Sequence, residues 1–246
     1  MKIMIPKIIH YCWFGKSPLP KSAVRCINSW KKYFPDYEIK EWNESNYDVN
    51  KIPYISQAYA AGKYAFVSDF ARFDIIYQHG GIYFDTDVEV IKPFDDILAK
   101  GAFFGCETDG GAGSYITVAP GLGIAAPAGL DVYKEILDYY SHLVFLNADG
   151  TLNTQTVVAH TTGILKNHGL EECDRIQMLD NITIYPKEFF NPLNNNTGRL
   201  DQTNNTHSIH WYSMTWLSKN ERIKSNITRI FHRLFGEDCF SRFRKK

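Results

Sequence analysis

Two glycines, a short apolar stretch and two carboxylates follow one another at residues 80–87, in the order Gly-Gly-Ile-Tyr-Phe-Asp-Thr-Asp. Ile82 and Phe84 predict a buried strand, and side chains two residues apart in a strand point to the same side. Asp85 and Asp87 therefore direct their oxygens to one point if the strand continues that far. Two carboxylates at one point repel each other unless a cation joins them, so this spacing predicts a divalent metal site at a strand end.

The stretch before the acid pair predicts a buried helix that ends at the two glycines. Between Lys63 and His79, aromatic and aliphatic residues recur about one turn apart. Asp69 and Arg72 are three residues apart on this helix and so share one face. Because buried charges need partners, this pair is expected to be more than a weak surface ion pair. Gly80 accepts the left-handed conformation that ends many helices.

Composition places few limits on function but excludes some classes. The 246 residues suit one α/β domain or two small ones, and 44% of them are apolar. The 27 basic and 27 acidic residues cancel, so bulk charge does not indicate nucleic-acid binding. The chain has no apolar run of spanning length and no signal-peptide pattern, and its five scattered cysteines suit a reducing compartment. We therefore expect a cytoplasmic protein.

The order of elements predicts an α/β fold whose central sheet is mostly parallel and flanked by helices. Strands and helices alternate through the first half, as in a nucleotide-binding unit. Strands are expected at 5–13, 37–42, 82–84, 102–106, 121–126 and 208–211, helices at 21–34, 53–61, 63–79, 130–146 and 154–167, and a long loop at 191–206. We expect one domain over residues 1–218 and a separate tail over 219–246.

The tail at 219–246 contains nine Lys or Arg against three acids. Its Ile, Leu and Phe residues fall near helical spacing with basic residues between them, which predicts a basic amphipathic helix. Such a helix can lie on an anionic membrane surface, or it can pack its apolar side onto the domain. The sequence leaves both possibilities open.

Four segments of the chain resemble a known family. They are Ser-Asp-Phe-Ala-Arg at 68–72, the glycine and acid run at 80–87, the opening strand Ile-Pro-Lys-Ile-Ile-His-Tyr-Cys-Trp-Phe-Gly at 5–15, and His-Trp-Tyr-Ser-Met-Thr-Trp at 210–216. Together they are similar to the DXD sugar transferases, which include yeast-type initiating α-mannosyltransferases, bacterial capsular-polysaccharide glycosyltransferases and, more distantly, the clostridial glucosylating toxins. The last segment departs from the family's His…Ser-Trp element, because Thr215 replaces Ser.

The resemblance implies a single GT-A-type nucleotide-sugar-binding domain with a metal held by the acid pair. Mn²⁺ and Mg²⁺ prefer carboxylate oxygens, and Mn²⁺ tolerates one imidazole. Asp85 and Asp87 would supply the carboxylates, and His210 is the candidate third ligand by its position in the late motif. A core histidine beside Trp211 is the alternative for His210. His207 is a weaker candidate, and Thr215 could share the role.

The resemblance also implies a donor site. Trp13 would stack on uracil, although core packing explains it equally well from the pattern. Asp69 would accept hydrogen bonds from sugar hydroxyls, and Arg72 would bind a hydroxyl or phosphate through its planar fork. Tyr83 would contact the nucleotide, and Trp216 would donate its indole N–H to the β-phosphate. The residues expected to act in catalysis are Asp85, Asp87 and Arg72.

The implied activity is retaining transfer of a hexose from a nucleotide sugar, with UDP-galactose or UDP-glucose favoured, to a saccharide or lipid-linked saccharide acceptor in surface polysaccharide synthesis. Peripheral contact with the inner face of the plasma membrane would come from the tail.

One alternative is a haloacid-dehalogenase-type phosphatase, because the segment 85–87 also fits the nucleophile loop of that class. That loop normally follows the first strand, and no later metal motif of that class is present. A non-catalytic sugar-binding protein is the other alternative.

Overall fold

The computed structural model describes residues 4–111, 114–213, 228–229 and 232–233. The basic amphipathic helix predicted at 219–246 lies outside the described residues, apart from residues 228–229 and 232–233, which are helical. No helix in the described part of the chain is long and apolar enough to cross a membrane.

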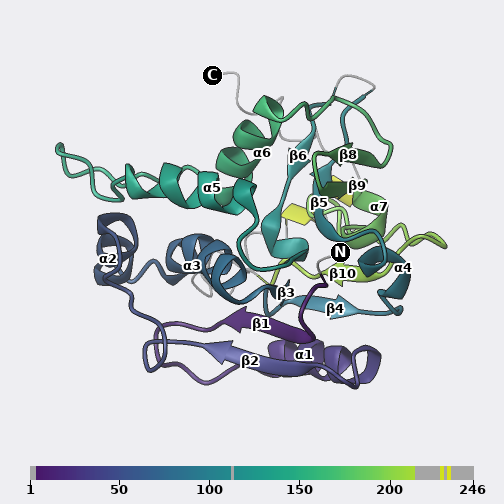
Figure 1. The fold of residues 1–246 in the computed structure, drawn as a ribbon, viewed down its shortest axis with the longest axis horizontal. Helices are drawn as coiled ribbons and strands as arrows, with labels where there is room; N and C mark the ends of the chain where they lie inside the picture. The colour runs from purple at the N-terminus through teal and green to yellow at the C-terminus, as the bar shows by residue number, and fades with distance from the viewer. Residues whose placement is uncertain (1–3, 112–113, 214–227, 230–231, 234–246) are drawn as a thin grey trace.

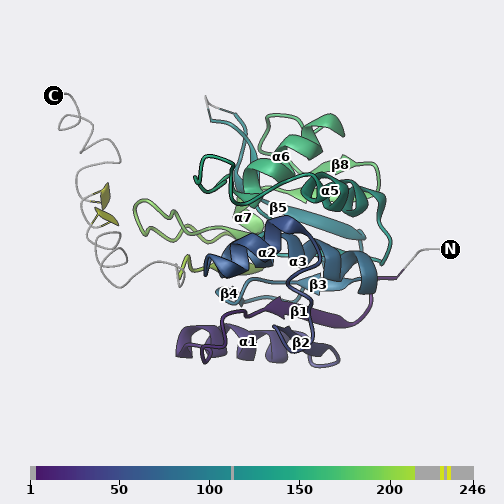
Figure 2. The same ribbon diagram turned by 90° about the vertical axis from the view of Figure 1, so that its left-hand side faces the viewer.

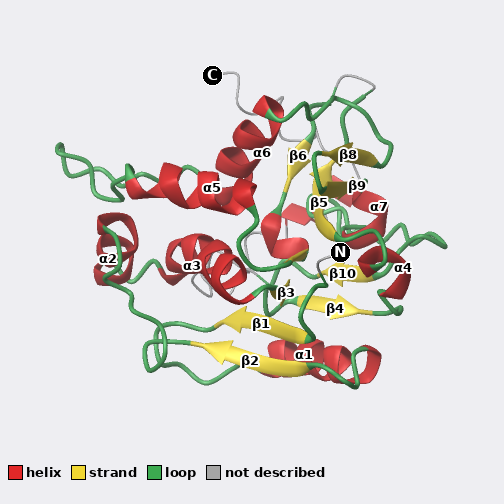
Figure 3. Cartoon of the chain, viewed as in Figure 1, coloured by secondary structure: helices red, strands yellow, loops and turns green. Residues whose placement is uncertain are grey.

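A central eight-stranded sheet organises the molecule (Figures 1 and 3). Its order is β2-β1-β3-β7-β5-β9-β8, and β6 pairs with β5 at the side. Their bounds are β1 Ile8–Cys12, β2 Glu38–Trp42, β3 Gly81–Tyr83, β5 Ala102–Thr108, β6 Thr117–Val118, β7 Ile124–Ala126, β8 Gln177–Leu179 and β9 Ile182–Tyr185. The pairings make β1, β2, β3, β5 and β9 run in one direction, whereas β6, β7 and β8 run in the other. The predicted α/β class with a mostly parallel sheet is confirmed.

Helices cover both faces of this sheet, as Figures 1 and 2 show. The longer helices are α1 Lys21–Tyr33, α2 Pro53–Ala60, α3 Tyr64–His79, α5 Asp131–Ser141 and α6 Val157–Asn167, and two short ones are α4 Asp95–Leu98 and α7 Lys187–Phe190. Strand residues alternate between two cores: Phe103 packs with residues of α1, α4 and α7, whereas Phe104 packs with residues of α2, α3, α5 and α6. This alternation is the two-residue period of a strand that is buried on both faces.

A second, two-stranded sheet joins distant parts of the chain. Strand β4 (Val88–Val90) pairs antiparallel with β10 (Ser208–His210), and His210 lies opposite Val88. The late motif of the sequence is thereby placed directly beside the acid pair. A 3₁₀ turn, η1 (Pro120–Leu122), lies between β6 and β7.

The glycine pair between α3 and β3 is held by a buried histidine. His10 is fully buried, and its Nε2 lies 3.0 Å from the Gly80 carbonyl oxygen while Trp42 Nε1 donates to its Nδ1 at 3.1 Å. Burial lowers the pKa of His10 to about 4, so the ring is neutral. Gly80 has φ +64°, as predicted for a glycine at this helix end, but its ψ of −169° lies outside the left-handed helical region. A Cβ at Gly81 would collide with the Ile8 carbonyl oxygen.

The hydrogen bond of Trp30 tests how α1 supports the segment that carries the acid pair, Asp85 and Asp87. Its indole N–H donates to the Val88 carbonyl oxygen at 2.8 Å inside the core. Trp30→Phe leaves that carbonyl without its donor and opens space beside it, so we expect a loss of about 2 kcal/mol in the free energy of unfolding. Urea denaturation measures this. The control Tyr33→Phe removes a hydroxyl that contacts Lys32 Nζ at the surface and should change stability by less than about 0.5 kcal/mol. Wild-type stability for Trp30→Phe would show that the bond contributes nothing.

Candidate active site

The acid pair lies on a turn and not on a continuing strand. Strand β3 ends at Tyr83, and the Val88 N–H donates to the Asp85 carbonyl oxygen at 3.0 Å, which closes a tight turn. The strand therefore does not continue as far as Asp87, which was the condition for Asp85 and Asp87 to share one side of it. The chain turns here because β4 leaves the main sheet to pair with β10. The Asp85 amide donates to the Gly121 carbonyl oxygen at 3.1 Å.

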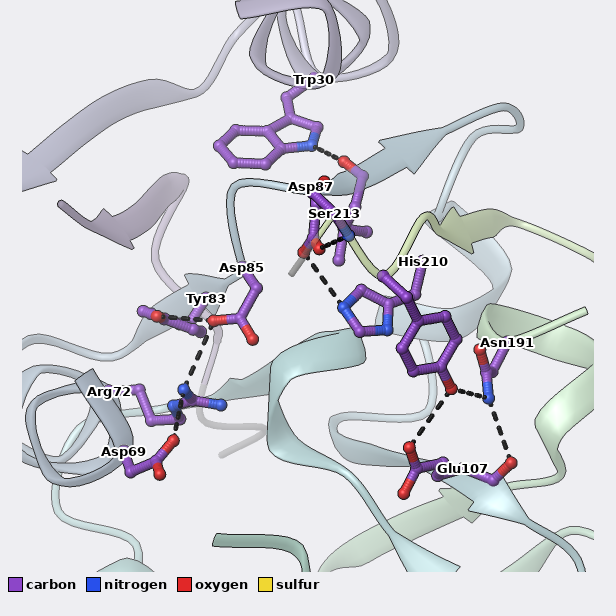
Figure 4. A network of polar contacts seen from close by, with 12 residues as sticks. Trp30, Asp69, Arg72, Tyr83, Asp85, Asp87, Glu107, Asn191, His210 and Ser213 are labelled. Atoms are coloured by element: carbon purple, nitrogen blue, oxygen red, sulfur yellow. Dashed lines mark hydrogen bonds and ion pairs between the residues drawn. The ribbon is translucent and has the colours of Figure 1, made fainter. Parts of the chain in front are cut away.

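The turn nevertheless brings the two carboxylates together with a histidine (Figure 4). One ligand atom from each of Asp85, Asp87 and His210 lies within 4.8 Å of the others. This is the one such group of His, Cys, Asp or Glu among the described residues. The sequence motif predicted these three residues as metal ligands, and the structure places them side by side.

Asp87 has three contacts with His210, at the end of β10, and with the residues that follow it. Its Oδ1 lies 3.0 Å from His210 Nε2, and its Oδ2 accepts from the Ser213 N–H at 2.8 Å. Its carbonyl oxygen accepts from the Trp211 N–H at 3.0 Å. Burial alone would raise the pKa of Asp87, but the charge and hydrogen bond of His210 and the bond from Ser213 lower it to about 2.

His210 is half-buried and packs against Tyr212. Burial opposes its charged form, but Asp87 and then Asp85 outweigh burial and raise the pKa of His210 above its usual range. Its Nδ1 is buried without a hydrogen-bond partner in the described part of the chain. The ring of Tyr212 lies 4.2 Å away between centroids, and Tyr212 has a φ of +49°. That conformation is costly for a residue with a side chain, so surrounding contacts must hold it.

A hydrogen-bonded set of three residues, Asn191, Tyr212 and Glu107, supplies those contacts. Asn191 is buried, and its Nδ2 donates to the Tyr212 hydroxyl at 2.8 Å and to the Glu107 carbonyl oxygen at 3.1 Å. The Tyr212 hydroxyl donates to Glu107 Oε1 at 3.3 Å. Figure 4 shows this group on the side of His210 away from Asp85. It fixes Tyr212, and Tyr212 in turn fixes the ring of His210 and the turn that carries the Ser213 amide.

Arg72 links the helix pair to the acid turn. The Arg72 side chain is buried, and its Nη2 lies 2.8 Å from Asp69 Oδ1 and 3.4 Å from Asp85 Oδ1. Its Nε donates to the Ser68 carbonyl oxygen at 3.1 Å, and its guanidinium lies 5.2 Å above the ring of Tyr83. Burial opposes its charge, but Asp85, Tyr83 and Asp69 together raise the pKa of Arg72, so the guanidinium stays protonated.

Tyr83 and Asp69 complete this side of the site. The Tyr83 hydroxyl donates to Asp85 Oδ1 at 2.9 Å, so that oxygen has both a hydroxyl and a guanidinium as partners. Burial raises the pKa of Asp69, and Arg72 opposes that shift. Four residues that the sequence predicted for one site, Asp69, Arg72, Tyr83 and Asp85, are therefore in one contact network.

Gly121 makes room for this network. A Cβ on Gly121 would collide with Asp85 Oδ2 and would lie 3.2 Å from Arg72 Nη1. Its own carbonyl oxygen accepts from the Asp85 amide. The turn η1 thus presents its backbone to the carboxylate, and only a residue without a side chain fits there.

The remaining predicted residues are Trp13, His207, Thr215 and Trp216. Trp13 follows β1, is half-buried, and its indole N–H donates to the Ser17 carbonyl oxygen at 2.6 Å. No hydrogen bond joins Trp13 to the acid turn among the described residues. His207 is buried between Asp96 Oδ1, 3.0 Å from its Nε2, and the Asn205 carbonyl oxygen, 2.7 Å from its Nδ1, so it is not part of the metal cluster. Thr215 and Trp216 lie outside the described residues.

Two carboxylates and one imidazole form a donor set that fits a divalent cation, and Mn²⁺ better than Mg²⁺ because of the imidazole. The orphaned His210 Nδ1 does not weaken this fit, because the ring presents its other nitrogen, Nε2, to Asp87.

Several residues of the site were not predicted. Gly121, Asn191, Glu107 and the Ser213 amide act through contacts between segments that are far apart in the chain. Gly121 was predicted as the first residue of a strand over 121–126, whereas the structure places it in η1, and strand β7 begins only at Ile124. A lone Asn in a long polar loop gave no signal at all.

Known proteins resemble parts of this chain. Residues 20–104 match the family described as "Glycosyltransferase sugar-binding region containing DXD motif". The chain is 29% identical over 110 residues to inositol phosphoceramide mannosyltransferase 1 of Schizosaccharomyces pombe, covering 40% of this chain and 33% of that protein. It is 35% identical over 111 residues to the uncharacterized glycosyltransferase L373 of Acanthamoeba polyphaga mimivirus, covering 41% and 43%. The solved structure of the PaToxG glycosyltransferase has a TM-score of 0.52 at 20% identity, covering 66% of this chain and 69% of that one.

These matches support the resemblance to the DXD sugar transferases over residues 20–104. The family region includes the Asp69–Arg72 pair and the triplet at 85–87, and the likeness to the solved structure confirms the expected glycosyltransferase fold. The matched region ends before Gly121 and His210, so these two residues of the candidate site lie outside it. The chain spans less than half the length of the curated relatives it matches.

Gly121 gives a test of the site that leaves every charged group in place. Gly121→Ala should displace the Asp85 carboxylate and weaken Mn²⁺ binding by about tenfold or more, as measured by calorimetry. The matched control is Gly163→Ala in α6, where an added Cβ meets no atom within 4 Å, and it should leave Mn²⁺ affinity unchanged. Wild-type Mn²⁺ affinity in Gly121→Ala would contradict the role given to this glycine.

Proposed function

We propose that this protein is a metal-dependent, retaining glycosyltransferase that moves a hexose from a nucleotide sugar to a saccharide acceptor. The observation that supports it most is the convergence of Asp85, Asp87 and His210 beside a buried Arg72. A transferase of this kind must stabilise a diphosphate leaving group, and a divalent cation on that diphosphate supplies the charge without proton transfer. The match of residues 20–104 to a sugar-binding region favours sugar transfer over the phosphatase alternative.

The residues would divide the work as follows. Asp85, Asp87 and His210 would hold the cation, and Ser213 and Tyr212 would keep two of those ligands in place. The bonds from Tyr83 and Arg72 orient one oxygen of Asp85, which leaves its other oxygen, Oδ2, for the cation.

The donor would be bound by the residues on the other side of the acid turn. Asp69 would accept hydrogen bonds from hydroxyls of the sugar. Arg72 would contact a hydroxyl or a phosphate oxygen through the part of its fork that Asp69 and Asp85 leave open. Trp13 would stack on the base from the end of β1, and Trp216 would donate to the β-phosphate. The acceptor's proton would pass to the leaving phosphate oxygen on the same face of the sugar.

UDP-galactose and UDP-glucose are the proposed donors, with GDP-mannose next because a relative is named as a mannosyltransferase. A saccharide or lipid-linked saccharide in surface polysaccharide synthesis is the proposed acceptor. We place the enzyme in the cytoplasm. Its tail at 219–246 would contact the inner face of the plasma membrane or pack onto domain 1–218. One bond supports packing: Arg229 Nε donates to the Asn195 carbonyl oxygen at 2.8 Å.

The metal assignment is tested by Asp87→Asn. The amide oxygen can still accept from the Ser213 N–H, so the turn should stay folded, but the charge needed for the cation is lost. We expect hydrolysis of UDP-hexose with Mn²⁺ to fall by about a hundredfold or more. Wild-type hydrolysis should stop in EDTA and return with added Mn²⁺. Undiminished turnover in the presence of chelator would refute metal dependence.

The role of the planar fork is tested by Arg72→Lys. One ammonium cannot reach Asp69, Asp85 and the Ser68 carbonyl oxygen together, so kcat/KM for the donor should fall by about a hundredfold. The control Arg175→Lys alters an exposed pair with Glu171 and should leave kcat/KM unchanged. Circular dichroism monitors the fold of both variants. Equal kcat/KM for Arg72→Lys and the wild type would mean that only its charge matters.

A further inference from the structure

A pocket separate from the candidate active site opens between α5 and α6. These helices lie side by side on the face of the sheet that α3 also covers (Figures 1 and 2). Its volume is about 500 Å³. Its lining includes one tyrosine ring, two side-chain amides, two carboxylates, two histidines and a glycine, among them Tyr139, Gln155, Asn167, Asp138, His160 and Gly163. None of these residues belongs to the network around Asp85.

Tyr139 forms a fixed aromatic surface in this pocket. It is 38% exposed, yet its hydroxyl lies 3.0 Å from His160 Nδ1 and the two rings are 5.1 Å apart. His160 itself is buried, and burial lowers its pKa, so its ring is neutral. A ring held in this way loses little freedom when a ligand stacks on it.

The lining has an unsatisfied polar atom and an unexplained glycine. His160 Nε2 is buried and has no hydrogen-bond partner among the described residues, which is costly unless a ligand or water completes it. Gly163 lies inside α6, where a glycine is about 1 kcal/mol less favourable than alanine. An added Cβ at Gly163 would meet no atom within 4 Å, so packing does not require this glycine. Its absent side chain leaves space in the pocket.

The charges of the lining favour an uncharged ligand. No Lys or Arg lines the pocket in the described part of the chain, so a phosphate or uronate would find no counter-charge there. Both carboxylates of the lining already have partners: Lys134 Nζ lies 2.6 Å from Asp138 Oδ2, and His168 Nε2 lies 2.7 Å from Glu135 Oε2. An aromatic face, amides and carboxylate oxygens together match the apolar faces and the hydroxyls of a neutral sugar.

The pocket is one helix away from the donor side of the active site. Tyr140, the neighbour of Tyr139, projects from another side of α5 and packs edge-on against Phe70 at 5.9 Å between centroids. Phe70 lies on α3 between Asp69 and Arg72. An α-helix is about 10 Å across, a distance that a short oligosaccharide can span.

We propose that the pocket between α5 and α6 binds an uncharged oligosaccharide, as a subsite for the acceptor chain at a distance from the reacting end. The acceptor role rests on the proposed transferase function, whereas saccharide binding to this pocket does not. Tyr139 would stack on one sugar ring, and Gln155 and Asn167 would form hydrogen bonds with its hydroxyls. Gly163, which has no side chain, would leave space for that ring.

The experiment is calorimetric titration of the full chain, in EDTA and without donor, with uncharged trisaccharides of glucose, galactose and mannose. At least one should bind at concentrations up to about 10 mM, and trigalacturonate should not. Tyr139→Ala and Gly163→Phe should weaken binding by about tenfold, and Gly163→Ala should weaken it while raising the melting temperature. The control Tyr115→Ala removes a ring that is 78% exposed outside the pocket and should bind as the wild type does. Saturation-transfer NMR on the same samples reports contact with the sugar even if Gly163→Phe fails to fold.

The outcomes separate the two proposals. No binding of any uncharged trisaccharide, or unchanged affinity in Tyr139→Ala and Gly163→Ala, overturns the subsite, whatever the activity of the enzyme. Binding that these variants weaken supports the subsite. If the wild-type protein binds the trisaccharide but hydrolyses no nucleotide sugar with Mn²⁺, the proposed transferase function is wrong, whereas the pocket is still a saccharide-binding site. Tyr139→Ala should hydrolyse UDP-hexose at the wild-type rate when no acceptor is present, because the donor network is intact.

Discussion

The short antiparallel pairing of β4 with β10 is the interaction on which the site depends. It places His210 opposite Val88, beside the turn that carries Asp85 and Asp87, although more than a hundred residues separate the two segments. Each strand has only three residues and lies apart from the main sheet, so the pairing needs support from its surroundings. Trp30 supplies part of it from α1, through its bond to the Val88 carbonyl oxygen.

A buried guanidinium fixes the opposite side of the same turn. Removing Arg72 from water costs several kcal/mol, and that cost is offset only because the side chain has two carboxylates, a carbonyl oxygen and an aromatic face as partners. The carboxylate of Asp85 is therefore oriented before any ligand arrives. Pre-orientation of this kind lowers the entropy that binding would otherwise cost. The close approach of the η1 backbone at Gly121 belongs to the same arrangement.

The local signals in the sequence predicted much of this architecture. The helix that carries Asp69 and Arg72, its end at Gly80 and the strand that follows were predicted within a residue or two, because each is encoded by neighbours in the chain. The strand does not continue through Asp87, the condition under which the two acids would share one side of it, because pairing with β10 overrides local strand preference. The family resemblance supplied His210, which its own surroundings in the sequence would have assigned to the core. Contacts such as those of Gly121, Asn191 and Ser213 depend on tertiary approach and have no local pattern.

The charges of the site show why a cation and an anionic donor suit it together. With His210 protonated, the two acids of the turn are balanced by His210 and Arg72, so the four groups carry no net charge. A divalent cation bound through the imidazole requires that ring to be neutral, so the cation replaces a proton there. The same four groups with the cation then carry one net positive charge. Electrostatic attraction in this partly buried setting is stronger than in water. Counting these four groups alone, a diphosphate would meet a net positive charge only with a cation bound.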